Sequence, residues 1–466
     1  MLFNSVQYFL FLGLVLVLFY SSRGAVRKWV LFLASYLFYA SWNWRFVPLL
    51  LTLTAIDYSA ALWMGRVRTD RKKLLLLASV LANLAFLGFF KYYNFLAGNA
   101  AALVGMAPSS FALGIILPLG ISFHTLQSIS YVVDVYRGEQ KPVSNPLDYA
   151  LFICFFPQLV AGPIVRARTF FRDLYNWHPP SGEDRASGIL LVALGLTKKM
   201  AFADQFAIVS DSYFHNVTGQ PGMLTAWSAS IAFILQVYFD FSGYTDIAIG
   251  SAKLLGFHFP VNFNRPFLAS SLTELWRRWH ISFSKWLRDY IYVPLASGRR
   301  GEWAVFRNLM ITMILGGLWH GANWNFIVWG AYHGALLSLE RTWRVRERRR
   351  GPSEAVVNLY ALQALLTFLL FAMGAPFFRA RTFADAIHVI GQMFTLSPGV
   401  VLLNSWQIGL IGLSLTLAYC EEKLGWFQRL TTGPAWVFTG ALTLILLCLM
   451  LFGVTEASVP FVYFQF

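Results

Sequence analysis

Apolar stretches long enough to cross a bilayer as helices recur along this chain, and they limit its fold more than any other feature. Clear examples are Phe46–Met64, Ala226–Leu255 and Phe306–Leu339, each at or above the roughly 18 residues that a membrane helix needs. Charged residues make up only 13% of the chain and hydrophobic residues 57%. A soluble core does not have this balance. The sequence therefore predicts an all-α polytopic integral membrane protein, with about eleven to thirteen membrane helices including broken or re-entrant ones.

Basic residues gather in the short loops between apolar stretches. Arg23–Lys28 and Arg66–Lys73 are rich in Arg and Lys, and they alternate with turns that hold only Arg45 or Lys91. Because basic loops stay on the cytoplasmic side, this alternation places the amino terminus outside. The first apolar run, Val6–Tyr20, leads into further spans, so we expect no cleaved signal. The net charge of +15 is explained by orientation in the bilayer, and nucleic acid is not an expected partner.

The middle of the chain interrupts its apolar runs with proline, glycine and polar residues. Phe111–Tyr136 and Ala150–Arg166 are both broken in this way. Such breaks at membrane depth need protein or water around them, which favours re-entrant segments. We therefore expect amino-terminal membrane helices in residues 1–98, a core with re-entrant and interfacial helices in 99–340, and further membrane helices in 341–466.

An unusual helix is predicted over Ser271–Tyr292. Its first residues, Ser271-Leu-Thr-Glu274, have the spacing of a capping box. On a continuous helix Trp276 belongs to an aromatic face with His280 at its edge, and Arg277 falls elsewhere. This many charges cannot cross lipid, so we expect the helix at the interface or in a polar cleft.

His320 is the one titratable group of the segment Leu315–Trp324, inside the run Phe306–Leu339. An ionisable group in an apolar span either lines a polar path or site, or is hydrogen-bonded between packed helices, and both interpretations stay open here. Glycines inside a helix indicate close approach of another backbone or of a substrate. The glycines of this run are Gly316, Gly317, Gly321, Gly330 and Gly334, and the last two form a small-x-x-x-small pair that predicts close helix packing.

Three kinds of site could be built from these polar groups. A serine hydrolase would need a G-x-S-x-G elbow, and the chain has none. A metal site would favour histidines at i and i+4, whereas His320 and His333 are thirteen positions apart and His280 has no histidine neighbour on its helix. No metal site is therefore expected. A buried histidine that acts as general base toward a hydroxyl or a thioester is the simplest remaining chemistry.

Several motifs, in order along the chain, resemble those of the membrane-bound O-acyltransferases, and most closely those members that O-acetylate alginate and other bacterial polysaccharides. The resemblance is strong from Gln236 to Glu340 and weak after Leu359. The motifs are Leu117-Pro-Leu-Gly-Ile-Ser-Phe-His-Thr-Leu-Gln127, Phe155-Phe-Pro-Gln-Leu-Val-Ala-Gly-Pro163, Tyr238-Phe-Asp-Phe-Ser-Gly-Tyr-Thr-Asp246, Phe263-Asn-Arg-Pro-Phe267, Trp276-Arg-Arg-Trp-His-Ile-Ser-Phe-Ser-Lys-Trp-Leu-Arg-Asp-Tyr290 and Gly316-Gly-Leu-Trp-His-Gly-Ala-Asn-Trp324.

The resemblance implies a ring of membrane helices around a thinned centre that is pierced by a tunnel. The family's central histidine maps to His320 and its second histidine or polar partner to His280. The implied activity is transfer of acetyl from a cytoplasmic donor, expected to be acetyl-CoA, across the bacterial inner membrane to an alginate-like exopolysaccharide, with cellulose or peptidoglycan as other acceptors. No bound cofactor is implied. The implied partners are the polysaccharide machinery and an outer-side acetyltransferase resembling SGNH hydrolases.

Further residues at membrane depth are candidates for lining the tunnel or contacting substrate. We expect Asp240, Tyr244 and Asp246 to serve mainly as structural pairs for Arg265 or Arg277, and His333 to be structural. Trp319 and Trp324 fit either tunnel walls or plain packing. The full set of candidates beyond the two histidines is Trp319, Trp324, Asn323, Tyr244, Asp240, Asp246, Trp276 and Arg277.

Two alternatives remain at this point. A D-alanyl-type acyltransferase would take its acyl group from a carrier protein rather than from acetyl-CoA. A proton-coupled transporter would use the intramembrane histidine as a relay. The absence of an internal repeat counts against the transporter, as does the charged, aromatic helix Ser271–Tyr292.

Overall fold

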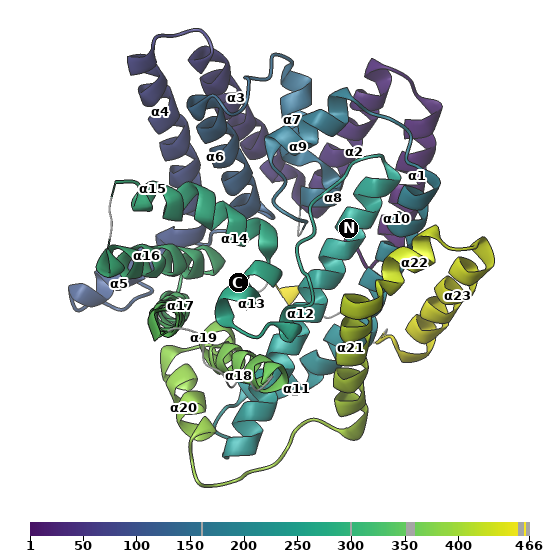
Figure 1. Cartoon of the computed structure of the whole chain (residues 1–466). Coiled ribbons are helices and arrows are strands. Elements are labelled where there is room, and N and C mark those ends of the chain that lie inside the picture. Colours follow the sequence, from purple (N-terminus) through teal and green to yellow (C-terminus); the bar gives the residue numbers. More distant parts are fainter. Residues whose placement is uncertain (160–161, 299–300, 351–358, 455–460, 463–466) are drawn as a thin grey trace. The chain divides into compact units, whose positions relative to one another are not determined.

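The computed structural model describes all residues except 160–161, 299–300, 351–358, 455–460 and 463–466. Within the described residues every regular element is helical, as predicted. The chain divides into two compact units. The first comprises Met1–Val192 and Tyr244–Pro260, and the second comprises Ala193–Gly243 and Val261–Phe466. Two helices, α10 and α12, supply residues to both units (Figure 1).

The first unit holds the amino-terminal helices. Its helices are α1 (Val6–Ser21), α2 (Ala25–Asn43), α3 (Val47–Met64), α4 (Thr69–Leu87), α5 (Tyr93–Leu103), α6 (Ile121–Arg137), α7 (Pro146–Cys154), α8 (Phe156–Leu159), α9 (Ala167–Tyr175), and parts of α10 (Gly182–Thr197) and α12 (Met223–Leu254). The broken segment Phe111–Tyr136 is confirmed: it runs without regular structure before Gly120, whose φ of 72° starts α6. Residues 160–161 of the second predicted break lie outside the described residues.

The second unit holds the remaining helices. They are α11 (Asp204–His215), α13 (Leu272–Arg278), α14 (Ile281–Leu287), α15 (Val293–Ala296), α16 (Glu302–His320), α17 (Trp324–Arg350), α18 (Tyr360–Met373), α19 (Ala375–Arg379), α20 (Phe383–Met393), α21 (Ser405–Leu424), α22 (Trp426–Thr432) and α23 (Ala435–Phe452). A π-helical turn, Lys198–Ala203, joins α10 to α11.

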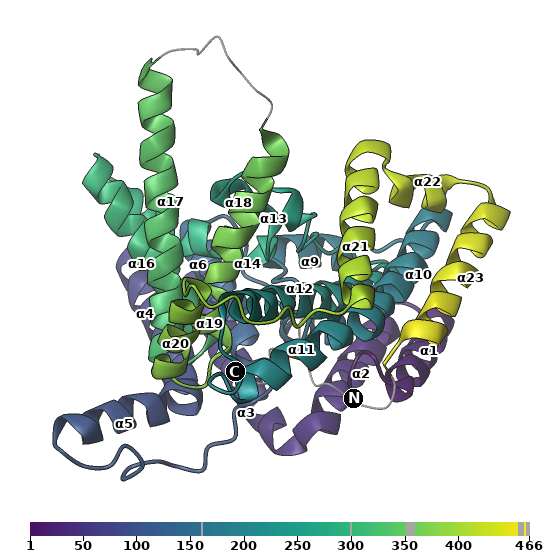
Figure 2. The ribbon, with the colours of Figure 1, turned by 90° about the horizontal axis from the view of Figure 1, so that it is seen from below.

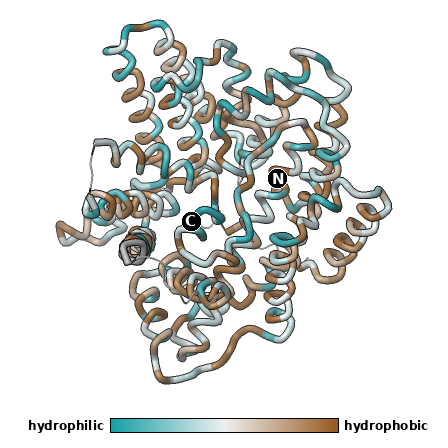
Figure 3. The backbone as a smooth tube through the Cα atoms, in the orientation of Figure 1, coloured by the Kyte–Doolittle hydropathy of each residue, from teal (hydrophilic) through white to brown (hydrophobic). Residues whose placement is uncertain are grey.

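Six helical stretches among the described residues are long and apolar enough to cross a membrane, and α1 is a shorter apolar helix. The six are Ala25–Met64, Thr69–Leu103, Gly182–His215, Met223–Leu254, Tyr360–Arg379 and Ala435–Phe452. Apolar residues recur along helices throughout the chain (Figure 3). These findings confirm a polytopic helical membrane protein. The predicted number of eleven to thirteen is larger because it also counts broken and shorter segments.

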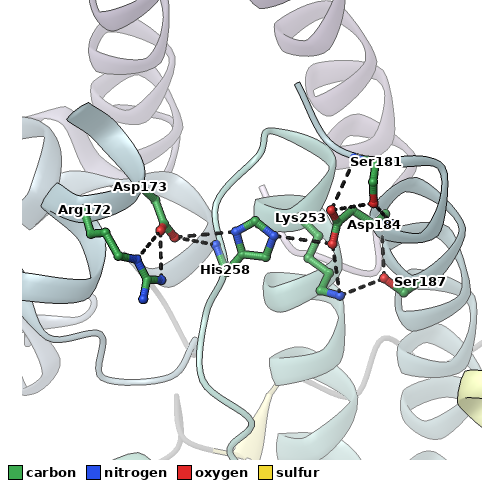
Figure 4. A network of polar contacts seen from close by, with 7 residues as sticks. All are labelled: Arg172, Asp173, Ser181, Asp184, Ser187, Lys253 and His258. Atoms are coloured by element: carbon green, nitrogen blue, oxygen red, sulfur yellow. Dashed lines mark hydrogen bonds and ion pairs between the residues drawn. The ribbon is translucent and has the colours of Figure 1, made fainter. Parts of the chain in front are cut away.

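A polar network ties three segments of the first unit together (Figure 4). His258, half-exposed, lies between two carboxylates: its Nδ1 is 3.7 Å from Asp173 and its Nε2 is 3.4 Å from Asp184. The backbone N–H of His258 also donates to Asp173 at 2.8 Å. At the end of α12, Lys253 reaches Asp184 at 3.6 Å and donates to Ser187 at 2.8 Å. The end of α12 is thereby fixed to α9 and α10.

In the second unit, α16 and α17 run side by side (Figure 2), and glycines allow their close approach. A Cβ at Gly317 would collide with the carbonyl oxygen of Phe326 on α17, and a Cβ at Gly330 would collide with the carbonyl oxygen of Met313 on α16. At Gly334 it would meet Met310. The predicted role of the Gly330 and Gly334 pair in close helix packing is therefore confirmed.

Candidate functional site

His320 is the last residue of α16 and not, as predicted, an interior residue of one continuous helix. The run Phe306–Leu339 is broken at Gly321, whose backbone is extended (φ −164°, ψ 152°), and α17 begins only at Trp324. Asn323 caps the new helix by accepting a hydrogen bond from the Asn325 N–H at 3.0 Å. Any side chain at position 321 would meet the ring of Phe326. The break therefore follows from a glycine and a capping asparagine.

An aromatic cage holds the imidazole of His320, which is only 6% exposed. Its ring centroid lies 5.0 Å from that of Trp319, 5.5 Å from Phe283, 5.3 Å from Trp329 and 5.0 Å from Phe378. The carbonyl end of a helix carries partial negative charge, which stabilises a cation by about 0.3 to 1 kcal/mol. This position suits a histidine that accepts a proton.

His280 also lies at a helix break. The predicted helix Ser271–Tyr292 starts as expected, with Ser271 accepting from the Glu274 N–H at 3.2 Å. It then ends at Arg278, and His280 adopts a left-handed backbone with φ of 42° before α14 begins. A non-glycine residue in this region is strained by about 1 to 3 kcal/mol and persists only where its surroundings enforce it. The prediction of one continuous helix was wrong.

The loop that precedes α13 enforces this break. The Asn264 N–H donates to the carbonyl of Arg278 at 2.8 Å, and the Ile281 N–H donates to the carbonyl of Asn262 at 2.8 Å. The side-chain oxygen of Asn262 accepts from the Ser282 N–H and hydroxyl and lies 3.3 Å from His280 Nδ1. His280 is 1% exposed, and its Nε2 has no hydrogen-bond partner within the described part of the chain.

The two histidines share aromatic neighbours. The ring of His280 lies 5.0 Å from Phe283 and 6.2 Å from Trp319, and the ring of His320 contacts the same two side chains. Phe283 and Trp319 are themselves stacked at 4.3 Å. The structure therefore brings together His320, His280 and Trp319 in one buried cluster in which each imidazole occupies a helix break.

An ion cluster fixes α13 to α21. Arg278 lies 2.8 Å from Glu274 and 3.2 Å from Glu422, and Arg265 lies 2.8 Å from Glu422. Burial alone would raise the pKa of Glu274, but hydrogen bonds from Ser270 and Arg278 lower it overall. The cluster thus anchors the segment before α13, through Arg265, and the end of α13 next to His280, through Arg278.

The predicted pairing of Asp240 with Arg265 or Arg277 was wrong. Arg265 pairs with Glu422 and Glu421, and the side chain of Arg277 is exposed. Asp240 instead lies 3.0 Å from Lys199, and both side chains are 1% exposed. Lys199 lies near the end of an apolar stretch, 41 positions before Asp240, and nothing in the sequence identifies the two as a pair.

The other candidates are spread over the structure. Trp276 contacts Trp329 and His333, at 5.8 and 5.4 Å, rather than lying beside His280 as predicted. Trp324 is 54% exposed. Tyr244, buried, and Asp246, half-buried, belong to the first unit, where the Tyr244 hydroxyl donates to Asn4 at 3.3 Å.

Several residues of the cluster were missed by the sequence analysis. Asn262, Trp329 and Phe378 each contact one of the two histidines. Asn262 stands one residue before the Phe263–Phe267 motif, so its position next to that motif was the available signal. Trp329 and Phe378 lie on α17 and α19, and nothing in their local sequence marks them as neighbours of His320.

Comparisons with known proteins agree with this architecture. The model of the membrane-bound O-acyltransferase family, MBOAT, matches residues 69–375. The chain is 38% identical to the "Probable alginate O-acetylase AlgI" of Pseudomonas putida over an alignment of 493 positions, gaps included, which covers 99% of both proteins. It is 36% identical over 416 residues to the "Peptidoglycan O-acetyltransferase" of Helicobacter pylori, covering 83% of this chain and 77% of that protein.

A more distant similarity points to the same reaction class. The "Teichoic acid D-alanyltransferase" of Bacillus subtilis is 28% identical over 284 residues, covering 57% of this chain and 69% of that protein. All three relatives carry acyl-transfer names, which favours an enzyme over the transporter alternative. The chain belongs to the membrane-bound O-acyltransferase family and is a membrane O-acyltransferase.

Proposed function

We propose that this enzyme transfers acetyl from cytoplasmic acetyl-CoA across the membrane for O-acetylation of an extracytoplasmic bacterial polysaccharide, with His320 as general base. The observation that carries the proposal is the buried cluster in which His320 and His280 both contact Phe283 and Trp319. Imidazole changes protonation near neutral pH, which acyl transfer to a hydroxyl requires. The alginate O-acetylase relative, 38% identical over 99% of both chains, favours an alginate-like polysaccharide.

The reaction follows from these roles. His320 accepts the proton of the acceptor hydroxyl while the hydroxyl oxygen forms a bond to the thioester carbonyl carbon. The carbon–sulfur bond then breaks, and the proton passes to the departing thiolate to give free coenzyme A. His280 orients His320 or shuttles the proton. The carbonyl end of α16 stabilises the imidazolium that forms during the transfer.

The proposal also covers the membrane location, the orientation and the partner of the enzyme. It would reside in the bacterial inner membrane with its amino terminus outside, as the alternation of basic loops indicates. The family's ring of helices and central tunnel would let the thioester enter from the cytoplasm. A partner resembling SGNH hydrolases, on the outer side, would receive the acetyl group and pass it to the polysaccharide.

The donor can be tested directly with the purified enzyme in nanodiscs, with an alginate oligosaccharide added as the hydroxyl acceptor. We expect acetyl-CoA to lose its thioester, with free coenzyme A measured by thiol titration, and a D-alanyl carrier protein to give no turnover. The opposite preference would identify a D-alanyl-type enzyme, in line with the teichoic acid relative, and would contradict the proposal.

Replacing His280 by asparagine is expected to lower kcat on the order of 100-fold, because the imidazole that assists His320 is lost. Asparagine tolerates the left-handed backbone at this position, so the break should survive. The measurement is acetyl-CoA turnover in nanodiscs. Arg288→Ala is the control: Arg288 carries an exposed ion pair with Asp289 and should turn over normally. A wild-type rate in His280→Asn would reduce His280 to a packing role.

A further inference from the structure

A buried ion pair in the second unit also binds backbone from a distant part of the chain. One oxygen of its aspartate faces the lysine, and the other accepts a backbone hydrogen bond. Lys199 lies 2.8 Å from Asp204 and 3.0 Å from Asp240. The other oxygen of Asp240 accepts a hydrogen bond from the backbone N–H of Val462 at 2.7 Å. Hydrogen bonds to a charged acceptor are short and strong, particularly when they are removed from water.

The segment that this carboxylate binds is itself buried. Phe461 is 0% and Val462 is 2% exposed. A second backbone contact lies next to Lys199: the Val454 N–H, after α23, donates to the carbonyl of Met200 at 3.0 Å. The π-helical turn Lys198–Ala203 and Asp240 therefore hold two points of the chain that follows α23.

The same segment reaches the candidate site through one aromatic residue. Phe461 contacts Phe241 with ring centroids 5.8 Å apart, and Phe241 follows Asp240 on α12. Phe241 in turn contacts the imidazole of His280 edge-on, at 4.7 Å and 89°. Phe241 therefore packs between Phe461 and one side of His280.

We propose that the Lys199–Asp240 pair is an intramolecular docking site for residues 461–462, and that this docking makes Asp240 a positioning residue for His280. Lys199 pairs with Asp240 and orients it, Asp240 accepts the hydrogen bond from the Val462 backbone, and Phe461 packs Phe241 against the imidazole. The docking itself stands on the contacts alone, whereas its effect on catalysis rests on the role proposed above for His280.

Hydrogen–deuterium exchange on the full chain in nanodiscs tests the docking. We expect the peptide that contains Val462 to exchange slowly in the wild type and about tenfold faster in Asp240→Ala, which removes the acceptor. Asp204→Ala is the matched variant: it removes the other carboxylate of Lys199 and leaves the acceptor of Val462, so protection should persist. Asp240→Leu, which has a similar size and no acceptor, serves if the alanine variant does not fold. Fast exchange in the wild type, or equal protection in Asp240→Ala, would overturn the docking.

Acetyl-CoA turnover tests the positioning. In Asp240→Ala we expect kcat to fall about tenfold while KM for acetyl-CoA stays unchanged, because His280 shifts and the donor site does not. Asp211→Ala is the control, since Asp211 pairs with Arg379 on a half-exposed surface. Faster exchange with an unchanged kcat would refute the positioning. An inactive wild type would refute the proposed donor, while the exchange result would still decide the docking.

Discussion

Alanine in place of His320 is expected to lower polysaccharide O-acetylation by about 100-fold to 10,000-fold, the range for loss of a general base. The imidazole is the group proposed to accept the hydroxyl proton, and the aromatic rings around it offer no substitute. The measurement is the O-acetyl content of polysaccharide from cells that depend on this protein, with membrane fractionation to show that the variant is inserted.

Two further substitutions separate chemistry from packing in this test. His320→Gln keeps a polar side chain of similar size but cannot act as a base, and it should be equally inactive. His333→Phe should retain activity, because His333 is fully buried among aromatic rings and neither of its nitrogens has a hydrogen-bond partner within the described residues. Full acetylation with His320→Gln would refute the assignment of the base.

The second large effect is expected at the contact between α16 and α17. Gly317→Ala would push a methyl group into the backbone carbonyl of Phe326, and neither backbone can move without separating the helices. Overpacking of this kind costs about 1 to 3 kcal/mol, and more where backbone is involved. Since Gly317 is three residues from His320, turnover should fall together with the apparent melting temperature in detergent.

A glycine without close neighbours provides the control for this substitution. Gly412 lies inside α21, and a Cβ there would meet nothing within 4 Å. Gly412→Ala should leave stability unchanged or raise it by about 1 kcal/mol through helix propensity. If Gly317→Ala were as stable as Gly412→Ala, the close approach of α16 and α17 would be refuted.

Periodicity and local motifs predicted much of the fold. Apolar length predicted membrane helices, and Ala226–Leu255 corresponds to the single helix α12. Ser271 caps a helix where the Ser-x-x-Glu spacing predicted one. Gly330 and Gly334 pack closely on α16 as expected. Each of these signals depends on residues within a few positions of one another, which sequence displays directly.

The helix breaks beside the two histidines were harder to predict. At His320 the local signal existed, since Gly321 and Asn323 are typical of a helix end and a new cap, but the apolar run around them suggested continuity. At His280 no local residue favours a break. The left-handed backbone is enforced by hydrogen bonds that Asn262 accepts and that Asn264 donates, and such tertiary contacts override helix propensity.

The electrostatic partners were also set by tertiary structure. Asp240 was expected to pair with Arg265 or Arg277, yet it pairs with Lys199 and the backbone of Val462. A buried carboxylate needs a partner, so the sequence could predict that a partner exists. Which basic residue pairs with Asp240 depends on how α12 packs against the turn Lys198–Ala203. The spacing of residues along the sequence does not show this packing.

The role of His320 as the base is best tested by single-turnover loss of the thioester from acetyl-labelled acetyl-CoA, with an alginate oligosaccharide as the hydroxyl acceptor, in the wild type and in His320→Gln in nanodiscs. We expect rapid appearance of free coenzyme A with the wild type and a rate at least about 100-fold lower with the variant. Equal rates for the two proteins would contradict it, because His320 would then not be the base of the transfer.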